Sequence, residues 1–205
     1  MERTYKEAVE RRRSYYAIDK RSPISDAEIE ALVRLTVTHV PSAFNSQSTG
    51  VVLLLGAHHT KLWSIVKETL RKIVPAAAFE NTEKKINAFD AGYGTLLYFE
   101  DQREVKTLQE QFPLYAEQFP FYSEHTSAMH QITLWTLLED AGLGASLQHY
   151  NPLIDEEVRQ TWHLPEDWKL IAQMPFGVPV QEPGTKTFKP LDNRIRVFNE
   201  LRIEN

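Results

Sequence analysis

Pro41-Ser42-Ala43-Phe44-Asn45-Ser46-Gln47-Ser48-Thr49-Gly50 runs directly into Val51-Val52-Leu53-Leu54-Leu55-Gly56, so that a polar turn is followed at once by an apolar run. Such a run predicts a buried strand, and the turn before it is then held at a rigid edge of the fold. Asn45 and Gln47 each offer one acceptor and two donors, which suits the edge of a planar heterocycle. A solvated turn is the alternative, and this stretch alone favours it.

Helical patterns flank this stretch on both sides. Upstream, Ser25 and Glu28 have the spacing of a capping box, and Pro41 ends the helix that follows them. Downstream, apolar residues recur at helical spacing from Leu62 to Ile73. Further helices are expected at residues 4–13, 82–88, 104–112, 123–140 and 155–162. The longest, 123–140, is apolar on more than one face and is therefore expected to be buried on several sides, with Gly142 as a left-handed cap.

Four more strands are expected, at residues 94–99, 145–150, 168–174 and 194–198. Glu100 and Asp101 are expected to bound the first of these strands, and Pro175 begins the segment expected to end the third. The aromatic segment 114–122 either lines an apolar pocket or fills core, and packing is the favoured interpretation. Helices and strands alternate without a regular βαβ rhythm, which predicts an α+β layered fold.

Composition is typical of one globular domain spanning residues 1–205. The chain is 42% hydrophobic and 25% charged, and it has no cysteine, which excludes disulfides and thiolate chemistry. No apolar run approaches the roughly 20 residues that span a bilayer, and the first residues lack the apolar core of a signal peptide. We therefore expect a cytoplasmic protein without a membrane partner.

Charge is distributed unevenly along the chain. The net charge of −5 argues against a nucleic-acid partner. Residues 1–21 nevertheless carry seven basic and four acidic side chains, and residues 185–205 carry five and three. If the two ends meet in the fold, they form an anion site; otherwise they are solvated basic segments.

Several chemistries find no support. The histidine pairs His58 and His59, and His125 and His130, lack metal-site spacing and are expected at the surface, so no metal site is predicted. Ser146 does not sit in a Gly-x-Ser-x-Gly elbow, and a hydrolase using Ser146 and His149 is disfavoured. Neither glycine-rich phosphate motif is present, so a nucleotide-type ligand has to be held by basic side chains and amides.

Five segments together resemble one known family. They are Arg12-Arg13-Ser14-Tyr15-Tyr16-Ala17-Ile18, Pro41-Ser42-Ala43-Phe44-Asn45-Ser46-Gln47, Gly142-Leu143-Gly144-Ala145-Ser146-Leu147-Gln148-His149-Tyr150-Asn151-Pro152, Pro175-Phe176-Gly177-Val178-Pro179, and Lys186 through Leu191. In this order, over nearly the whole chain, they resemble the nitroreductase-type FMN flavoproteins, most closely the subgroup named after fatty-acid repression mutant proteins. The resemblance implies a three-layer fold with a mainly antiparallel sheet, helices on both faces, and a homodimer.

The resemblance also implies where FMN binds. Arg12, Ser14 and Lys186 would meet the phosphate and ribityl chain, Asn45 and Gln47 the ribityl chain and ring edge, and the backbone around Gln148 the ring face. The full set of cofactor-binding residues that it implies is Arg12, Arg13, Ser14, Tyr16, Asn45, Gln47, Ser48, Gln148, His149, Lys186 and Lys189. Arginine binds phosphate bidentately and lysine acts as a point charge, which would account for basic ends on an acidic chain.

By the same resemblance the chain is an enzyme that passes electrons from NADH or NADPH through FMN to a nitroaromatic, quinone or related small acceptor by a ping-pong mechanism. The cofactor carries the chemistry, so no catalytic side chain is named. Three departures from the wider family stand out: Tyr16 and Phe188 replace basic residues, and Ser48 with Thr49 replaces Pro-Trp. They keep open the alternative of a flavin-binding regulatory or sensor protein without fast turnover.

Overall fold

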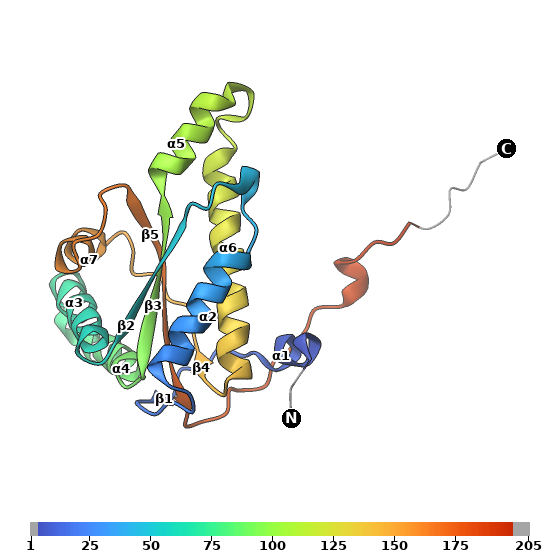
Figure 1. Ribbon diagram of the computed structural model, residues 1–205. Helices are drawn as coiled ribbons and strands as arrows, with labels where there is room; N and C mark the ends of the chain where they lie inside the picture. The colour runs from blue at the N-terminus through green and yellow to red at the C-terminus, as the bar shows by residue number, and fades with distance from the viewer. Residues whose placement is uncertain (1–3, 199–205) are drawn as a thin grey trace.

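The structure is a computed structural model that describes residues 4–198. An antiparallel sheet forms the middle layer of the protein (Figure 1). Its strands follow the order β1 (Ile18–Asp19), β5 (Trp168–Pro179), β3 (Gly94–Asp101) and β2 (Thr49–Leu55), and β4 (Gly144–Ala145) also pairs with β5. All eight positions of β3 are buried. The expected α+β fold with a mainly antiparallel sheet is confirmed.

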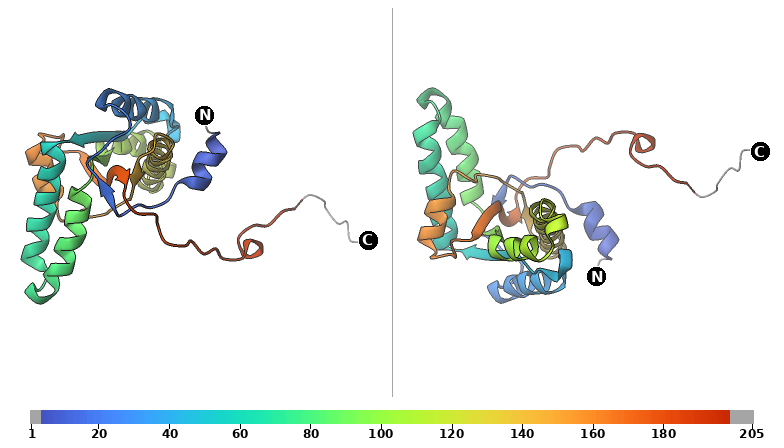
Figure 2. Two further views of the ribbon diagram at one scale, coloured as in Figure 1. Left: turned by 90° about the horizontal axis from the view of Figure 1, so that it is seen from below. Right: turned by 90° about the horizontal axis from the view of Figure 1, so that it is seen from above.

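Alternate side chains of β3 enter two separate hydrophobic cores. Leu96 and Tyr98 belong to the core beneath α2 (Asp26–His39) and α6 (Phe119–Asp140). Leu97 and Phe99 belong to the core on the opposite face, beneath α3 (Ala57–Ile73), α4 (Ala76–Asp90) and α7 (Asp155–Thr161). Figure 2 shows these helices on the two sides of the sheet, so the expected three-layer arrangement is confirmed.

The first two helices begin at capping boxes. In α2 the box joins Ser25 and Glu28, as the sequence predicts. In α1 (Tyr5–Arg11) a second box, which was not predicted, joins Thr4 and Glu7. Each box satisfies backbone donors that the first turn leaves free. Val40 has extended φ and ψ angles before Pro41, which ends α2 where expected.

On the other face, α4 is longer than the helix predicted at residues 82–88. Pro75 ends α3 and at the same time serves as the N-cap residue of α4. The residues after Pro75 are Ala76, Ala77 and Ala78, which are strong helix formers. The prediction read the proline as a boundary only and missed that a helix also begins there.

Strand β5 contradicts the expectation that it ends at Pro175. It continues through Pro175 and Gly177 to Pro179. The Pro175 carbonyl accepts a hydrogen bond from Ser146 N at 3.3 Å. A Cβ on Gly177 would lie 2.2 Å from the Asp19 carbonyl oxygen, so glycine is required for the close approach of the β1 backbone. Pro175 and Pro179 do not end the strand, because a proline is tolerated wherever the hydrogen-bond ladder does not need its missing N–H.

Two predicted strands are shorter or missing. The strand expected at 145–150 reduces to β4, after which only Gln148 forms an isolated bridge, with Gln173. Glu100 and Asp101 do not bound β3 but lie inside it and are buried. Residues 194–198 form no strand; they belong to an exposed tail that leaves the body after Pro179 and contains the short helix η3 (Leu191–Asn193).

The aromatic segment is more exposed than expected. It follows α5 (Gln102–Gln111) and contains η2 (Pro113–Tyr115) and the first turn of α6, which begins four residues before the predicted start. Phe119 is buried, whereas Leu114, Tyr115 and Phe121 are exposed. α6 also keeps an exposed apolar side within this chain. None of the helices in residues 4–198 is long and apolar enough to cross a membrane.

Candidate functional site

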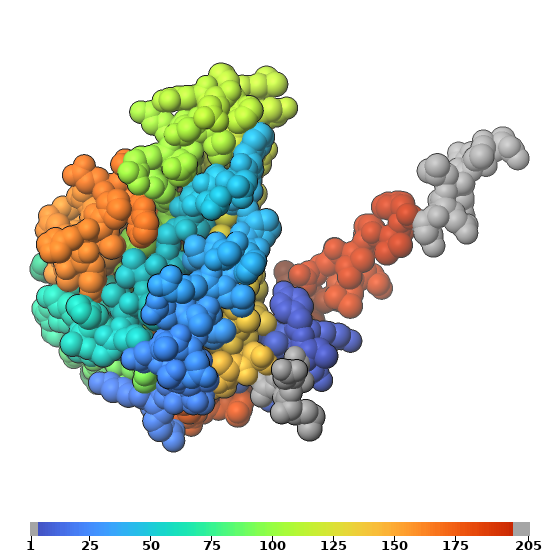
Figure 3. All heavy atoms as spheres, in the orientation of Figure 1, coloured from blue at the N-terminus to red at the C-terminus, as the bar shows by residue number. Residues whose placement is uncertain are grey.

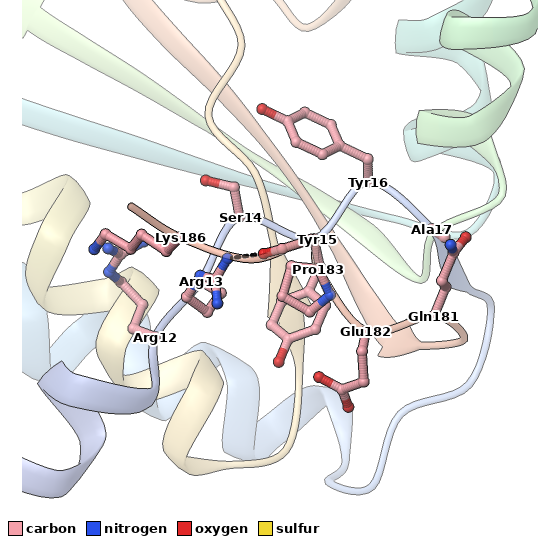
Figure 4. Close-up of a pocket in the computed structure, with 11 residues that line it drawn as sticks. Arg12, Arg13, Ser14, Tyr15, Tyr16, Ala17, Gln181, Glu182, Pro183 and Lys186 are labelled. Atoms are coloured by element: carbon pink, nitrogen blue, oxygen red, sulfur yellow. Dashed lines mark hydrogen bonds between the residues drawn. The ribbon is translucent and has the colours of Figure 1, made fainter. Parts of the chain in front are cut away.

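The basic ends of the chain meet at one pocket. Its volume is about 490 Å³, and it is lined by residues 12–17 and by Gln181, Glu182, Pro183, Gly184 and Lys186 (Figure 4). The structure thus brings together Arg12, Arg13, Ser14, Tyr16 and Lys186 from the predicted set. The two segments are therefore adjacent at these residues, although Tyr16 and Lys186 are also exposed to solvent.

The inner wall of this basic pocket is built by backbone contacts. Tyr15 N donates to the Ala145 carbonyl at 2.9 Å, and Ser14 forms a parallel bridge with Ala145. A Cβ on Gly144 would lie 2.8 Å from the Tyr15 ring, so glycine permits this close packing. The segment that carries Arg12 to Ser14 is therefore fixed against β4 at the edge of the sheet.

The two arginines of the pocket carry uncompensated charge. The Arg12 guanidinium lies over the Trp135 ring of α6, 4.4 Å from its centroid. Arg13 donates to the Gly184 carbonyl at 2.5 Å, the bond drawn dashed in Figure 4. Within residues 4–198 neither arginine has an acidic partner at ion-pair distance. Burial, and then the charge of Arg13, lower the pKa of Arg12. A site of this kind favours an anion.

The remaining basic candidates are placed differently. Lys186 lines the pocket, with its ammonium 5.1 Å from the Phe188 ring centroid. Lys189 lies further along the exposed tail and does not line the pocket. Tyr16, at a position expected to be basic, contributes an exposed phenol.

The amide residues lie at the opposite end of α6. Phe44, next to Asn45, packs on Phe119, with the ring centroids 5.4 Å apart. Because Arg12 lies on Trp135, sixteen residues further along α6, the two groups are separated by about 24 Å along the helix. One chain therefore does not bring Asn45, Gln47 and Ser48 to the basic pocket. Figure 3 shows this loop and the N-terminal helix at separate places on the surface.

The 42–48 loop presents its amides outward. Asn45 and Gln47 are exposed, whereas Ser48 is buried. The loop is held internally by Gln47 N, which donates to Ser42 Oγ at 2.9 Å. No hydrogen bond joins either side-chain amide to another of residues 4–198, so both remain available to a ligand.

The segment after β4 continues from the pocket wall along β5. Gln148 exchanges two backbone hydrogen bonds with Gln173, at 2.7 and 2.9 Å. Its side chain is buried and donates to Ser146 Oγ at 3.1 Å, while His149 is exposed. Ser146 is fully buried, and no hydrogen bond joins it to His149 in the described chain. This arrangement argues against a hydrolase.

The expectation that all four histidines lie at the surface is wrong for two of them. His59 is buried; its ring nitrogens lie 2.8 Å from Thr95 Oγ1 and 3.2 Å from the Asp90 carbonyl oxygen. His130 is buried on α6, with Nδ1 2.9 Å from the Thr126 carbonyl oxygen. Burial lowers the pKa of both imidazoles. Residues 4–198 contain no cluster of three or more metal-ligating side chains.

Three features of the site escaped the sequence analysis. Trp135, beneath Arg12, appeared only as one apolar residue of a long helix. Gly184 contributes a carbonyl, which no side-chain pattern reveals. Glu100 accepts hydrogen bonds from Ser48 and Thr49, the two residues that follow Gln47, and its position at the end of an apolar strand suggested only a boundary. An acidic residue directly after an apolar strand was the available signal for Glu100.

Comparison with known proteins identifies consistent relatives. The family profile "Nitroreductase family" matches residues 9–178. The Saccharomyces cerevisiae proteins HBN1 and nitroreductase FRM2, the latter the fatty-acid repression mutant protein, are 35% and 33% identical to the chain. These alignments cover 96% and 95% of this chain and 97% of each relative. The structure of nitroreductase CinD from Lactococcus lactis in complex with nicotinic acid has a TM-score of 0.88 and 42% identity, covering 96% of this chain and 100% of that one.

Proposed function

This chain belongs to the nitroreductase family and is an oxidoreductase, and we propose that it uses FMN to pass electrons from NADH or NADPH to nitroaromatic, quinone or related small acceptors by a ping-pong mechanism. The observation that carries the proposal is the basic pocket. Its arginine pair has no acidic partner at ion-pair distance among residues 4–198, and Ser14 and Lys186 share the same cavity.

The donor set of the pocket fits the phosphate of FMN. Two guanidiniums, an ammonium and a hydroxyl offer the charge-assisted hydrogen bonds that a dianionic phosphate requires. Bringing a phosphate between Arg12 and Arg13 relieves the repulsion that, with burial, lowers the pKa of Arg12. Trp135 and the Gly184 carbonyl fix the two arginines in place. Ser14 and the backbone beyond Ala145 would extend this wall toward the flavin ring.

A second copy of the chain would supply the amides. The basic pocket and the 42–48 loop lie at opposite ends of α6, about 24 Å apart. A two-fold axis that packs α6 antiparallel against its copy brings the loop end of one helix to the Arg12 end of the other. Asn45 and Gln47 would then contact the ribityl chain and ring edge from the partner, which accounts for their exposure in one chain.

The exposed apolar surface supports a homodimer. Met129 and Ile132 are exposed on α6, with Leu35 on α2 and Tyr5 on α1. A groove between these three helices adds to this face. The tail adds Phe188, Leu191, Ile195, Val197 and Phe198, all exposed. An apolar surface of this extent is typical of a protein interface.

Bound FMN would accept a hydride from the nicotinamide and pass electrons to the acceptor, so the chain's own groups bind, orient and exclude water. Phe44, Phe112 and Phe119 form an aromatic cluster beside the amides, with centroid distances of 4.8 to 6.2 Å; Phe44 and Phe112 are exposed, and the buried Phe119 supports them. Stacking on such rings suits planar acceptors. CinD has been crystallised with chloramphenicol and with 4-nitrophenol.

A purified sample tests the cofactor and the activity together. We expect FMN absorbance that survives gel filtration, and NADH or NADPH oxidation that depends on an added nitroaromatic or quinone. A protein that neither carries nor takes up FMN contradicts the proposal. Tight FMN binding without turnover would instead favour the regulatory or sensor role.

The amide pair is tested by the double variant Asn45→Ala, Gln47→Ala. Both side chains are exposed and have no hydrogen-bond partner among residues 4–198, so the fold is expected to be unchanged while FMN affinity falls about tenfold or more. The matched control is Asn81→Ala, Gln111→Ala, which removes two exposed amides elsewhere. Equal FMN retention in both double variants would contradict the proposal that Asn45 and Gln47 contact FMN.

Sedimentation tests the two-chain site directly. We expect a dimer at micromolar concentration, because the proposed FMN site is complete only when two chains meet. A monomer that still binds FMN with full affinity would contradict this part of the proposal.

A further inference from the structure

Glu100 is a buried carboxylate directly beneath the amide loop. It is fully buried in β3 and lies opposite Thr49 in the register of β2 and β3. Ser48 Oγ donates to its Oε2 at 2.6 Å, and Thr49 Oγ1 donates to its Oε1 at 2.5 Å. Both carboxylate oxygens are thus used by the two residues that follow Gln47.

The loop above Glu100 is strained. Phe44, Asn45 and Gln47 have φ angles of 55°, 54° and 51°, the left-handed region that residues with a Cβ adopt unfavourably. Such a conformation persists only when surrounding contacts determine it. The contacts on the body are the Phe44 ring at one end and, at the other, Ser48, whose carbonyl accepts from Asp101 N at 2.8 Å.

In the described part of the chain no basic side chain forms an ion pair with Glu100. Lys169, its register partner on β5, donates to Glu124 of α6 at 2.9 Å. Arg103 of α5 pairs with the neighbouring Asp101 at 2.7 Å. Burial, which is the largest cause, and the charges of Glu124 and Asp101 together raise the pKa of Glu100 to about 7, against the lowering effect of the two hydroxyls. No charged group of β2 faces the carboxylate.

We propose that Glu100 is a positioning residue: as a carboxylate it holds the 42–48 loop in the shape that presents Asn45 and Gln47 to the flavin, so FMN retention falls as the pH falls. The inference rests on the proposed function. A protonated carboxyl carries its proton on one oxygen, which becomes a donor. Ser48 or Thr49 then rotates its hydroxyl to accept this proton, so the two charge-assisted hydrogen bonds to Glu100 are no longer both present. By linkage, FMN binding also favours the ionised Glu100.

The first experiment measures FMN affinity against pH by flavin fluorescence, from pH 5.5 to 8.5. It compares the wild type, Glu100→Gln, and the control Glu110→Gln, which removes an exposed carboxylate of α5. At pH 8 we expect Glu100→Gln to bind FMN about tenfold more weakly than wild type, as for one lost charge-assisted hydrogen bond. The ratio of the two dissociation constants falls toward one at pH 6.

The ratio removes the titration of the FMN phosphate itself, which has a pKa near 6 and affects every variant alike. The control is expected to follow the wild type throughout. If Glu100→Gln and wild type show parallel pH profiles at any affinity, the inference is overturned. A second variant, Ser48→Ala with Thr49→Val, keeps the carboxylate but removes both donors, and it is expected to flatten the profile in the same way.

A measurement without FMN separates the two proposals. In the flavin-free protein, NMR is expected to show backbone amide signals of Asn45 and Gln47 that shift with the titration of Glu100, and no such shift in Glu100→Gln. If FMN does not bind but these shifts occur, the proposed function fails while the coupling of Glu100 to the loop stands. If FMN binds but the loop signals do not follow Glu100, the inference fails and the proposed function stands.

Discussion

At one end of α6 the basic pocket is open and its cations are held by few contacts, whereas at the other end the 42–48 loop is strained and tied to a buried carboxylate. Arg12 rests on one indole, and Arg13 has one carbonyl partner. Three loop residues, by contrast, have left-handed φ angles above a fully buried Glu100. Both regions are candidates for binding one ligand.

The difference reflects what each region has to recognise. A phosphate is bound by charge, which acts over several ångströms and tolerates small movements of long side chains. A ring edge is bound by directed amide hydrogen bonds, which weaken steeply when the geometry is wrong. Left-handed backbone costs roughly 1–2 kcal/mol for each residue with a Cβ, so the loop requires an anchor that the pocket does not.

The largest expected effect is complementation between two defective chains. Arg12→Ala, Arg13→Ala breaks the basic half, and Asn45→Ala, Gln47→Ala breaks the amide half. If each site takes one half from each chain, a mixed dimer contains one intact site and one that lacks both halves. Differently tagged chains, co-purified as heterodimers, are therefore expected to hold about half the FMN of the wild type, although both parents are nearly empty.

The same experiment has a clear contrary result. If both halves belong to one chain, every site of the mixed dimer lacks one half, and FMN content stays as low as in the parents. Heterodimers of wild-type chains with the two different tags provide the control for tagging and purification.

Removing the arginine pair alone is the next largest effect. Arg12→Ala, Arg13→Ala is expected to raise the FMN dissociation constant at least about 100-fold, because each charged hydrogen bond contributes roughly 1.5–3 kcal/mol. Fluorescence titration measures it. Arg11→Ala removes an equal charge from the neighbouring residue, whose guanidinium lies 3.8 Å from Glu139. A loss as large in Arg11→Ala would mean that general charge, rather than the pocket, binds the phosphate.

Glu100→Gln is expected to increase stability while it weakens binding. The pKa of Glu100 is raised from its ordinary 4.5 to about 7, so the folded state binds the proton more tightly. The stabilising contribution of the proton is fully present below about pH 4.5 and is lost as the pH rises through about 7. At pH 8 the variant is expected to gain roughly 2–3 kcal/mol in unfolding free energy. Urea unfolding measures the gain, and a less stable variant at pH 8 would contradict it.

The smallest expected effect is that of salt on FMN affinity, and it distinguishes the basic pocket from the 42–48 loop. Raising KCl from 50 mM to 1 M shortens the Debye length from over 10 Å to about 3 Å, so the half-buried arginines of the open pocket lose attraction for phosphate. We expect FMN affinity to fall severalfold in the wild type and in Glu100→Gln, but much less in Arg12→Ala, Arg13→Ala. Equal salt dependence in all three proteins would contradict the proposal that the basic pocket binds by charge and the 42–48 loop by directed hydrogen bonds.

Local signals in the sequence predicted most helices and the layered fold. The Ser25 and Glu28 box and Pro41 set both ends of α2 because capping and proline effects act within a few residues. Pro175 and Gly177 led to the wrong prediction that β5 ends at residue 174, because the role of these two residues depends on neighbours that are distant in sequence. Glycine is required at position 177 because the backbone of Asp19 lies too close for a Cβ, and this contact cannot be inferred from neighbouring residues in the sequence.

The candidate site was predicted to a similar degree. Charge placement indicated that residues 12–14 and Lys186 could share an anion site, and the structure brings them together. Glu100 and His59 were missed for one physical reason: whether an ionisable side chain is buried depends on packing across the sheet, not on its neighbours in sequence. The assignment of Asn45 and Gln47 to the flavin stays a prediction.

The length of α6 has a consequence for how relatives of this chain can diverge. Each inserted or deleted residue moves one helix end by about 1.5 Å and rotates it by about 100° relative to the other. Because Trp135 and Phe119 fix the two regions to opposite ends of the helix, a single-residue indel between them displaces both regions of a two-fold dimer at once. Variation within this stretch is therefore expected to accumulate as substitutions, while length changes collect in the tail beyond the basic pocket.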